Sequence, residues 1–390
     1  MKKLLSLALA LLLLAVMLPV VSMADEIAWE GSNNVYWQAG NDSGQTATLA
    51  DALKAAYMAN NGDITITCRP GSNVGSLTHG HVADNITIIG NGAYISGGEC
   101  DLEVDTFMFS RDTGSQVKSG GAYLDKDITI TASNLYNLGV WGQRNTNYTV
   151  NINLTNCDSK EISGEVNVQR VYISGTTGVN NITVTDCDFL TKATALYSNA
   201  NGTVVIDNCT FKGGQVPVNF NHKADGKQTV TVKNSTFTNC GDTGDWSAFA
   251  APVRFVNSGK GSLNATIENN TFTGTVGNNG DILLGDYREG KESHDVTATI
   301  TPNGTTKVRN SGIADEPTPI TGKVTADAKG NITRVQEEGP TTIVIISPTQ
   351  DTPKTDDQKN PTTGANDLVA VAVAAAALAL AGSAIILRKD

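Results

Sequence analysis

The middle of the chain alternates apolar and polar residues in short runs, and each run breaks once at an Asn or Asp. In one run Ile182 and Val184 share a face, Asp186 interrupts the alternation, and Cys187 and Phe189 then return to the same side. A period of two predicts β-strands that bury one face. Asn and Asp suit a corner between strands because they tolerate the left-handed backbone conformation.

This sequence pattern recurs along the chain at irregular intervals of roughly 22 to 35 residues. Such spacing is typical of coils of constant cross-section that carry loops of different length. The copies occupy residues 147–159, 181–189, 203–211, 229–237 and 263–272, with a fainter copy at 127–135. Their corner residues are Asn156, Asp186, Asn208, Asn234 and Asn269. We expect these side chains to form a column and to hydrogen-bond along it.

A third short apolar strand follows each copy. These strands occupy residues 171–173, 195–197, 218–220, 253–255 and 282–284. Three strands per coil with an Asn-type corner resemble the right-handed parallel β-helix of pectate-lyase-like proteins, over roughly residues 45–300. The fold class expected is therefore all-β, a single-stranded right-handed parallel β-helix (solenoid).

An N-terminal capping helix is predicted at residues 48–60. Thr48 has the character of an N-cap with Asp51 three residues later, and Leu49, Ala52 and Leu53 lie on one helical face. Such a helix would cover the first coil and protect its open edge from pairing with another chain.

The first 24 residues predict a signal peptide. Lys2 and Lys3 precede an apolar run that extends to about Val21, and the run closes on Ser22-Met23-Ala24 with small residues at the two positions that signal peptidase reads. An uncleaved membrane anchor is the alternative. Either way, we expect the chain to be exported.

The other end predicts attachment to a Gram-positive cell wall. The sequence Asn360-Pro361-Thr362-Thr363-Gly364 resembles the sortase signal Leu-Pro-x-Thr-Gly, with Asn in place of Leu. Residues 368–387 are almost wholly apolar and long enough to span a bilayer, and Arg388 and Lys389 follow. The resemblance implies transient membrane insertion, cleavage after Thr363 by a sortase, and transfer to peptidoglycan. A plain transmembrane anchor is the alternative.

These signals divide the chain into five parts. They are the signal peptide at 1–24, the β-helix with its cap at 25–302, a small β appendage or cap at 303–347, a tether with the sorting motif at 348–363, and the hydrophobic sorting helix with its basic tail at 364–390. Removing 1–24 and 364–390 takes away four of 28 basic and two of 39 acidic side chains, which leaves a net charge of −13. This charge argues against nucleic acid as a partner.

Three of the six cysteines share one position in the repeat. Cys157, Cys187 and Cys209 follow their corners, where other copies have Ser235 and Asn270. We therefore expect a buried ladder of small side chains, because free Cys packs as a small hydrophobe.

The candidates for catalysis are few. Asp158 and Asp188 are expected on neighbouring coils about 5 Å apart, where paired carboxylates serve glycoside hydrolysis or Ca²⁺ binding. Arg170 and Arg254 lie where a pectate lyase of this fold would place its base, but no recognisable catalytic set surrounds them. We predict no metal site and no cofactor, with Ca²⁺ as the one alternative.

We favour the hypothesis that one outward face of the coils binds a ligand. Tyr172 should point outward between inward Val171 and Ile173, and Trp141, Asn219 and Arg254 hold similar strand positions. Aromatic faces beside hydrogen-bonding groups can hold sugars. We therefore expect a wall-anchored binding or adhesion module that recognises glycans on a host or other surface. The alternatives are a surface polysaccharide lyase or glycoside hydrolase, and a structural spacer.

Overall fold

The computed structural model describes residues 27–59, 63–77, 85–97, 101–104, 107–109, 116–118, 127–143, 148–162, 165–166, 170–241, 249–285, 295–310 and 316–335. All of them belong to one compact unit that ends at Gln336. The predicted signal peptide, tether, sorting motif and sorting helix lie outside the described residues. No helix within the described ranges is long and apolar enough to cross a membrane.

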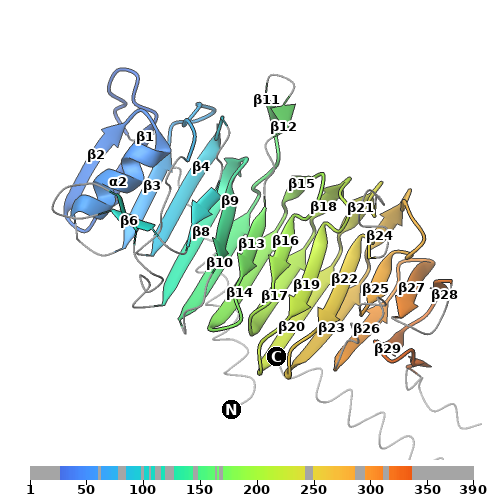
Figure 1. Cartoon of the computed structure of the whole chain (residues 1–390). Coiled ribbons are helices and arrows are strands. Elements are labelled where there is room, and N and C mark those ends of the chain that lie inside the picture. The colour runs from blue at the N-terminus through green and yellow to red at the C-terminus, as the bar shows by residue number, and fades with distance from the viewer. Residues whose placement is uncertain are drawn as a thin grey trace, which may run out of the picture. The chain divides into compact units, whose positions relative to one another are not determined.

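The chain forms a parallel β-helix, as predicted, in which successive coils lie side by side along one axis (Figure 1). The long sheet has 13 strands in the order β2 (Asp42–Thr46), β1 (Val35–Ala39), β3 (Ile64–Cys68), β4 (Ile86–Tyr94), β8 (Ile128–Tyr136), β10 (Thr149–Thr155), β14 (Val179–Thr185), β17 (Gly202–Asp207), β20 (Lys227–Lys233), β23 (Ser262–Glu268), β26 (Val296–Thr301), β29 (Val324–Asp327) and β30 (Ile332–Arg334).

Two further sheets complete the coils. The nine-stranded sheet has the order β28 (Thr318–Ile320), β27 (Thr306–Asn310), β25 (Ile282–Leu284), β22 (Val253–Asn257), β19 (Val218–His222), β16 (Leu196–Ser198), β13 (Val171–Ser174), β9 (Gly139–Gln143) and β5 (Asp101–Glu103). The four-stranded sheet has the order β15 (Asp188–Leu190), β18 (Thr210–Lys212), β21 (Thr236–Thr238) and β24 (Thr271–Thr273). Two small hairpins, β6 (Phe107–Phe109) with β7 (Gln116–Lys118) and β11 (Glu161–Ile162) with β12 (Glu165–Val166), lie beside the coils.

The predicted corner residues form a column between the long and four-stranded sheets. Asn156, Asp186, Asn208, Asn234 and Asn269 all adopt left-handed backbone, with φ between 51° and 54°. Asn91 and Asn134 adopt the same conformation at φ 51° and 52°, so the column begins two coils before Asn156, and Asn134 lies in the fainter copy at 127–135. The backbone N–H of each predicted corner residue donates a hydrogen bond to the next coil. For example, the Asp186 N–H donates to the Asp207 carbonyl over 3.1 Å.

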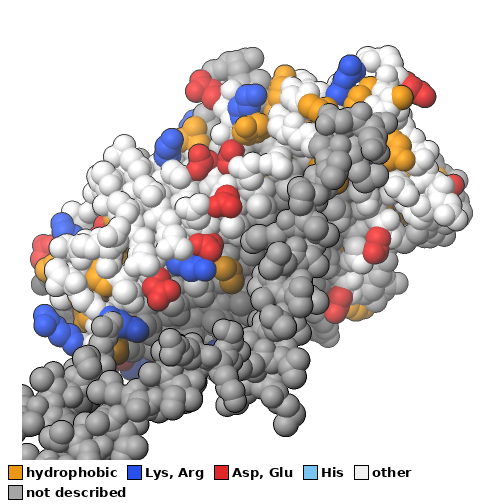
Figure 2. Space-filling view, turned by 180° about the vertical axis from the view of Figure 1, so that it is seen from behind, with side chains coloured by type: hydrophobic (Ala, Val, Ile, Leu, Met, Phe, Trp, Pro, Cys, Tyr) orange, Lys and Arg blue, Asp and Glu red, His pale blue; other side chains and the backbone are white. Residues whose placement is uncertain are grey.

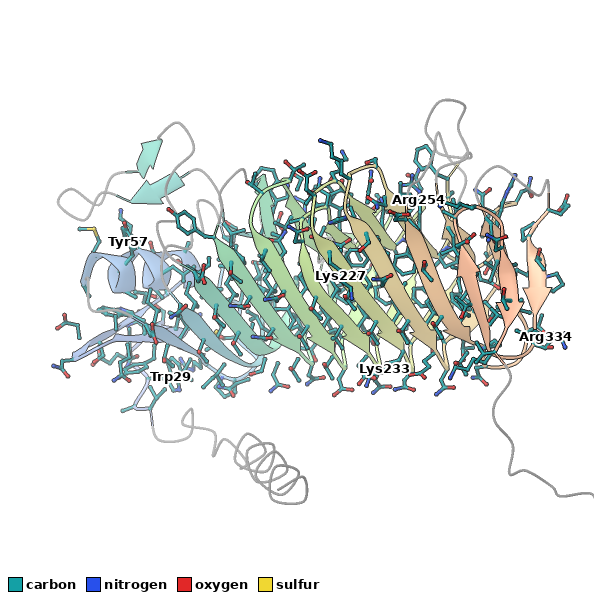
Figure 3. The ribbon with its side chains drawn as sticks, turned by 90° about the horizontal axis from the view of Figure 1, so that it is seen from below. Trp29, Tyr57, Lys227, Lys233, Arg254 and Arg334 are labelled. Atoms are coloured by element: carbon teal, nitrogen blue, oxygen red, sulfur yellow. The ribbon has the colours of Figure 1, made fainter. Side chains whose placement is uncertain are left out.

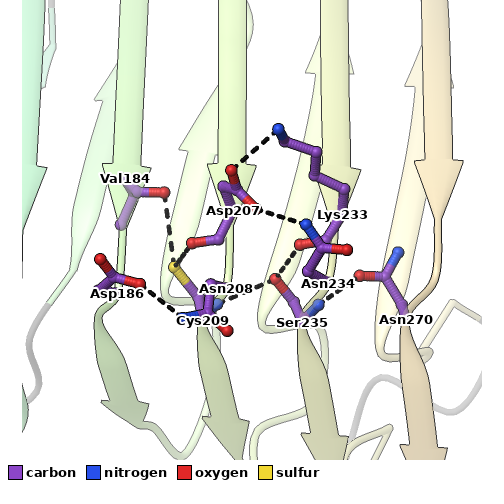
Figure 4. A network of polar contacts seen from close by, with 9 residues as sticks. All are labelled: Val184, Asp186, Asp207, Asn208, Cys209, Lys233, Asn234, Ser235 and Asn270. Atoms are coloured by element: carbon purple, nitrogen blue, oxygen red, sulfur yellow. Dashed lines mark hydrogen bonds and ion pairs between the residues drawn. The ribbon is translucent and has the colours of Figure 1, made fainter. Parts of the chain in front are cut away.

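The corner side chains bond along the column, but not always to each other (Figure 4). The Asn156 amide donates to Asn134, and the Asn208 amide donates to the Asp186 carboxylate over 2.6 Å. Asn234 instead donates to Asp207, the residue before the preceding corner, over 2.8 Å. A carboxylate is a stronger acceptor than an amide, which explains the change of partner.

The interior consists of aligned columns of like side chains. Cys157, Cys187 and Cys209 are buried free thiols, so the predicted ladder of small side chains is confirmed, and Ser235 and Asn270 continue it. Beside it, four rings stack with centroids 5.0, 4.8 and 5.0 Å apart, in the order Phe189, Phe211, Phe237 and Phe272.

The ends of the stack are closed differently. Helix α2 (Leu49–Ala59) covers the first coil, and its cap is the predicted one: Asp51 N–H donates to Thr48 Oγ over 3.1 Å. At the other end, β28, β29 and β30 pair antiparallel with their neighbours. The parallel pairing of the nine-stranded sheet continues to β27, past the boundary predicted at residue 302.

Candidate functional site

One outward row of the nine-stranded sheet brings the predicted binding residues together. The strand register aligns Trp141, Tyr172, Tyr197, Asn219 and Arg254 across β9, β13, β16, β19 and β22. The neighbours of Tyr172 in its strand, Val171 and Ile173, are fully buried, so its predicted outward direction is confirmed. In Figure 3, Arg254 and Lys233 lie at opposite sides of the stack.

A pocket of about 230 Å³ opens on this row. It is lined by Tyr172, Thr194, Tyr197, Asn219, Asn221, Phe249 and Arg254, and we call it the tyrosine pocket. The rings of Tyr172 and Tyr197 stack with centroids 4.4 Å apart and planes inclined by 12°. Because parallel register holds these two side chains on adjacent strands, they form a preformed aromatic wall.

Arg254 occupies the polar part of the tyrosine pocket. Only 4% of this residue is exposed, and its Nη1 donates to Asn219 Oδ1 over 3.2 Å. Its guanidinium carbon lies 5.0 Å from the centroid of the Phe249 ring, a cation–π arrangement. These contacts restrain the guanidinium at the lining of the tyrosine pocket.

Tyr197 remains a neutral phenol at ordinary pH. Burial raises its pKa to about 12, the neighbouring Tyr172 adds to this, and Arg254 opposes it. The Tyr197 hydroxyl accepts a hydrogen bond from the Asn199 amide over 3.4 Å. The pocket therefore offers a hydroxyl and an amide beside an aromatic surface and one fixed cation.

The sequence identified only part of this pocket. It predicted Tyr172, Asn219 and Arg254, whereas Trp141 lies in the same row but does not line the cavity. Tyr197 was not predicted, because the polar residues that follow it leave open whether its side chain points inward or outward. Phe249 lies in the connection before β22, where no periodicity could have indicated it.

Of the four candidate catalytic residues, only Arg254 lines the tyrosine pocket. Asp158 and Asp188 lie on neighbouring coils beside the four-stranded sheet, as expected, and Asp158 Oδ1 accepts the Asp188 N–H over 2.9 Å. Burial raises the pKa of Asp158, and the nearby charge of Asp188 adds to this while the hydrogen bond opposes it. Arg170 forms an ion pair of 2.5 Å with Asp101, so it is held in a structural contact.

The described residues contain no group of three or more His, Cys, Asp or Glu side chains arranged to hold a metal ion. Charged side chains on the face shown in Figure 2 are scattered rather than gathered in a patch. Comparison with family models, with curated proteins and with solved structures finds no significant match.

Proposed function

We propose that this chain is an exported, wall-anchored surface protein of a Gram-positive bacterium whose β-helix binds glycans through the tyrosine pocket. The observation that carries the binding part is the stacked pair of Tyr172 and Tyr197 beside the fixed Arg254 guanidinium. Aromatic walls with a few convergent polar groups are typical of ligand sites.

The chemistry of the lining favours a sugar. The apolar C–H face of a pyranose packs on an aromatic ring, while its hydroxyls need donors and acceptors at the rim. The aromatic rings are supplied by Tyr172, Tyr197 and Phe249, and the hydrogen-bonding groups by Asn219 and Arg254. At about 230 Å³ the pocket is smaller than most drug-sized sites, which favours one sugar unit of a longer chain.

The location rests on the two ends of the sequence. An export signal at residues 1–24 and the motif from Asn360 to Gly364, followed by an apolar segment and Arg388-Lys389, support export and sorting to peptidoglycan. The rigid stack between these ends would then display the tyrosine pocket outside the cell.

The test is binding of the mature chain, residues 25–363, to an array of polygalacturonate and host glycans. Saturable binding that Tyr197→Ala weakens at least tenfold, without product release, is the expected result. Tyr136→Ala is the matched control, because Tyr136 is paired in strand register with another tyrosine, Tyr94, but lies in the long sheet. Release of sugars or of unsaturated chain ends would establish the lyase or hydrolase alternative instead. Absence of any binding would leave the role of a structural spacer.

A further inference from the structure

The column of phenylalanines ends in an uncovered ring. Phe189, Phe211 and Phe237 are buried, whereas Phe272 at the end of the column is only partly buried. One face of Phe272 stacks on Phe237 with centroids 5.0 Å apart and planes inclined by 14°. Among the described residues, no further ring contact extends the column beyond Phe272.

The reason is a strand that the last coil lacks. The four-stranded sheet ends at β24, although the long sheet continues with β26 and the nine-stranded sheet with β27. Only residues 302–305 join β26 to β27, which is too short for a strand between them. The position about 5 Å beyond Phe272, where a fifth ring would lie, is therefore left unfilled by the coil.

A pocket of about 460 Å³ opens at this position. Phe272 and Pro317 are the apolar residues of its lining, and the polar ones include Thr275, Asn278, Thr305, Lys307 and Glu316. Its volume lies within the range typical of ligand sites. It is separate from the tyrosine pocket and shares no lining residue with it.

The loop that borders this pocket is held in place by a buried carboxylate. Asp281 accepts the Thr275 hydroxyl over 2.6 Å and the Lys307 N–H over 2.8 Å, so both of its oxygens are engaged within the protein. A side chain at Gly280 would meet the Lys307 carbonyl at 2.8 Å, so the close approach requires glycine. The pocket is thus preformed rather than shaped on binding.

An exposed apolar residue adjoins the pocket. Val276, between the lining residues Thr275 and Gly277, is 41% exposed. Among the described residues it is one of two large apolar side chains with such exposure, the other being Val335. Its position places apolar surface beside the opening over Phe272.

We propose that this pocket binds a neutral pyranose whose ring continues the phenylalanine column. An aromatic face beside hydroxyl and amide groups suits a sugar, since a peptide's aromatic side chain would leave the polar lining without partners. Two acidic residues, Asp281 and Glu316, and one basic residue, Lys307, line the pocket. This balance disfavours an acidic sugar. The proposal shares the ligand class of the proposed function but depends on a different site.

The test measures binding to the mature chain by saturation-transfer NMR and calorimetry. The probes are cellobiose and N,N′-diacetylchitobiose, with digalacturonate as the acidic counterpart and N-acetyltryptophanamide as the aromatic one. All measurements are repeated with Tyr197→Ala, which removes the first site. We expect a neutral disaccharide to bind the Tyr197→Ala chain, and Phe272→Leu in that background to weaken it at least tenfold.

Phe189→Leu is the matched control, because it makes the same substitution at the buried end of the same column. It should change the affinity less than twofold. Equal losses with Phe272→Leu and Phe189→Leu, or preference for digalacturonate or N-acetyltryptophanamide, would overturn the inference. If Tyr197→Ala alone abolishes all sugar binding, the inference fails while the proposed function stands. Sugar binding that Tyr197→Ala leaves unchanged and that Phe272→Leu abolishes would support the inference, whereas the proposed function of the tyrosine pocket would fail.

Discussion

The amide of Asn208 donates a hydrogen bond of 2.6 Å to the carboxylate of Asp186, 22 residues earlier in the chain. Both residues adopt the left-handed backbone conformation, with φ of 52° at Asn208 and 54° at Asp186. Each corner therefore contributes twice: it turns its own strand and it bonds to the neighbouring coil. The same stacking of coils pairs Tyr172 with Tyr197 in the nine-stranded sheet.

Replacing a corner residue should destabilise the stack. Asn208→Ala loses the side-chain bond and forces left-handed backbone on Ala, so we expect a loss of about 2 kcal/mol in the free energy of unfolding. Asn208→Gly should lose less, because glycine adopts this backbone freely. Denaturant unfolding measures both. Asn264→Ala, on the outward face of β23, is the control, and an effect of Asn208→Ala no larger than this control would contradict the corner role.

The tyrosine pocket should require arginine rather than any cation. Arg254→Lys keeps the charge but loses the planar guanidinium that bonds to Asn219 and lies beside the Phe249 ring. We expect glycan affinity to fall about tenfold, equivalent to about 1.4 kcal/mol. Calorimetry at matched ionic strength checks this. Unchanged affinity for Arg254→Lys would show that the orientation of the guanidinium does not matter.

The stability of the stack should fall as the pH drops below about 6.5 because of one buried histidine. Burial lowers the pKa of His222, while its hydrogen bond with Asn257 and the charge of Asp225 oppose this. The folded chain then binds fewer protons than the unfolded chain, so stability is complete above the unfolded pKa and declines as pH falls.

His222→Gln should flatten the pH dependence of unfolding between pH 7 and 5. Two aspartates affect stability only in more acidic solution, below about pH 3.9. Burial opposes the charged form of Asp207, but hydrogen bonds from Lys233 and Asn234 lower its pKa. Burial likewise opposes the charged form of Asp327, but hydrogen bonds from Asn331 and Lys329 lower its pKa. An identical slope for the wild type and His222→Gln between pH 7 and 5 would exclude His222 as the source.

The interior cysteines should resist modification in the folded chain. Burial raises the pKa of Cys68 and Cys240 to about 12, and hydrogen bonding with Cys157 and Cys209 together with burial raises that of Cys187. Thiolates are the reactive form, so iodoacetamide should label these residues only after denaturation. Mass spectrometry of alkylated peptides reports each site. Rapid labelling of Cys187 under native conditions would show that the coils open there.

The proposed sorting motif from Asn360 to Gly364 predicts a covalent product. Pro361→Ala should abolish release of the chain with wall fragments after muramidase digestion, and the protein should then remain with the membrane fraction. The wild type should carry a peptidoglycan fragment on Thr363, which mass spectrometry of the C-terminal peptide detects. A wild-type chain that ends at Asp390 would contradict sorting and support a plain membrane anchor.

The sequence predicted the repeating features better than the singular ones. Period-two alternation placed Tyr172 outward and Cys187 inward, and the interruption at Asp186 located the corner column. Phe249 could not be predicted, because it lies in a connection that no repeat constrains. The pocket beside Phe272 arises from a strand that the last coil lacks, which becomes visible only once the coils are assembled. The pairing of Asn234 with the Asp207 carboxylate rather than with the corner Asn208 likewise becomes visible only once the coils are stacked.

A crystal structure of the mature chain with a glycan that the array identifies would test the tyrosine pocket most directly. We expect electron density for one sugar unit between the Tyr172–Tyr197 pair and Phe249, with a hydrogen bond from Arg254. A ligand bound instead on the outward face of the long sheet, with the tyrosine pocket empty, would contradict the proposed binding site.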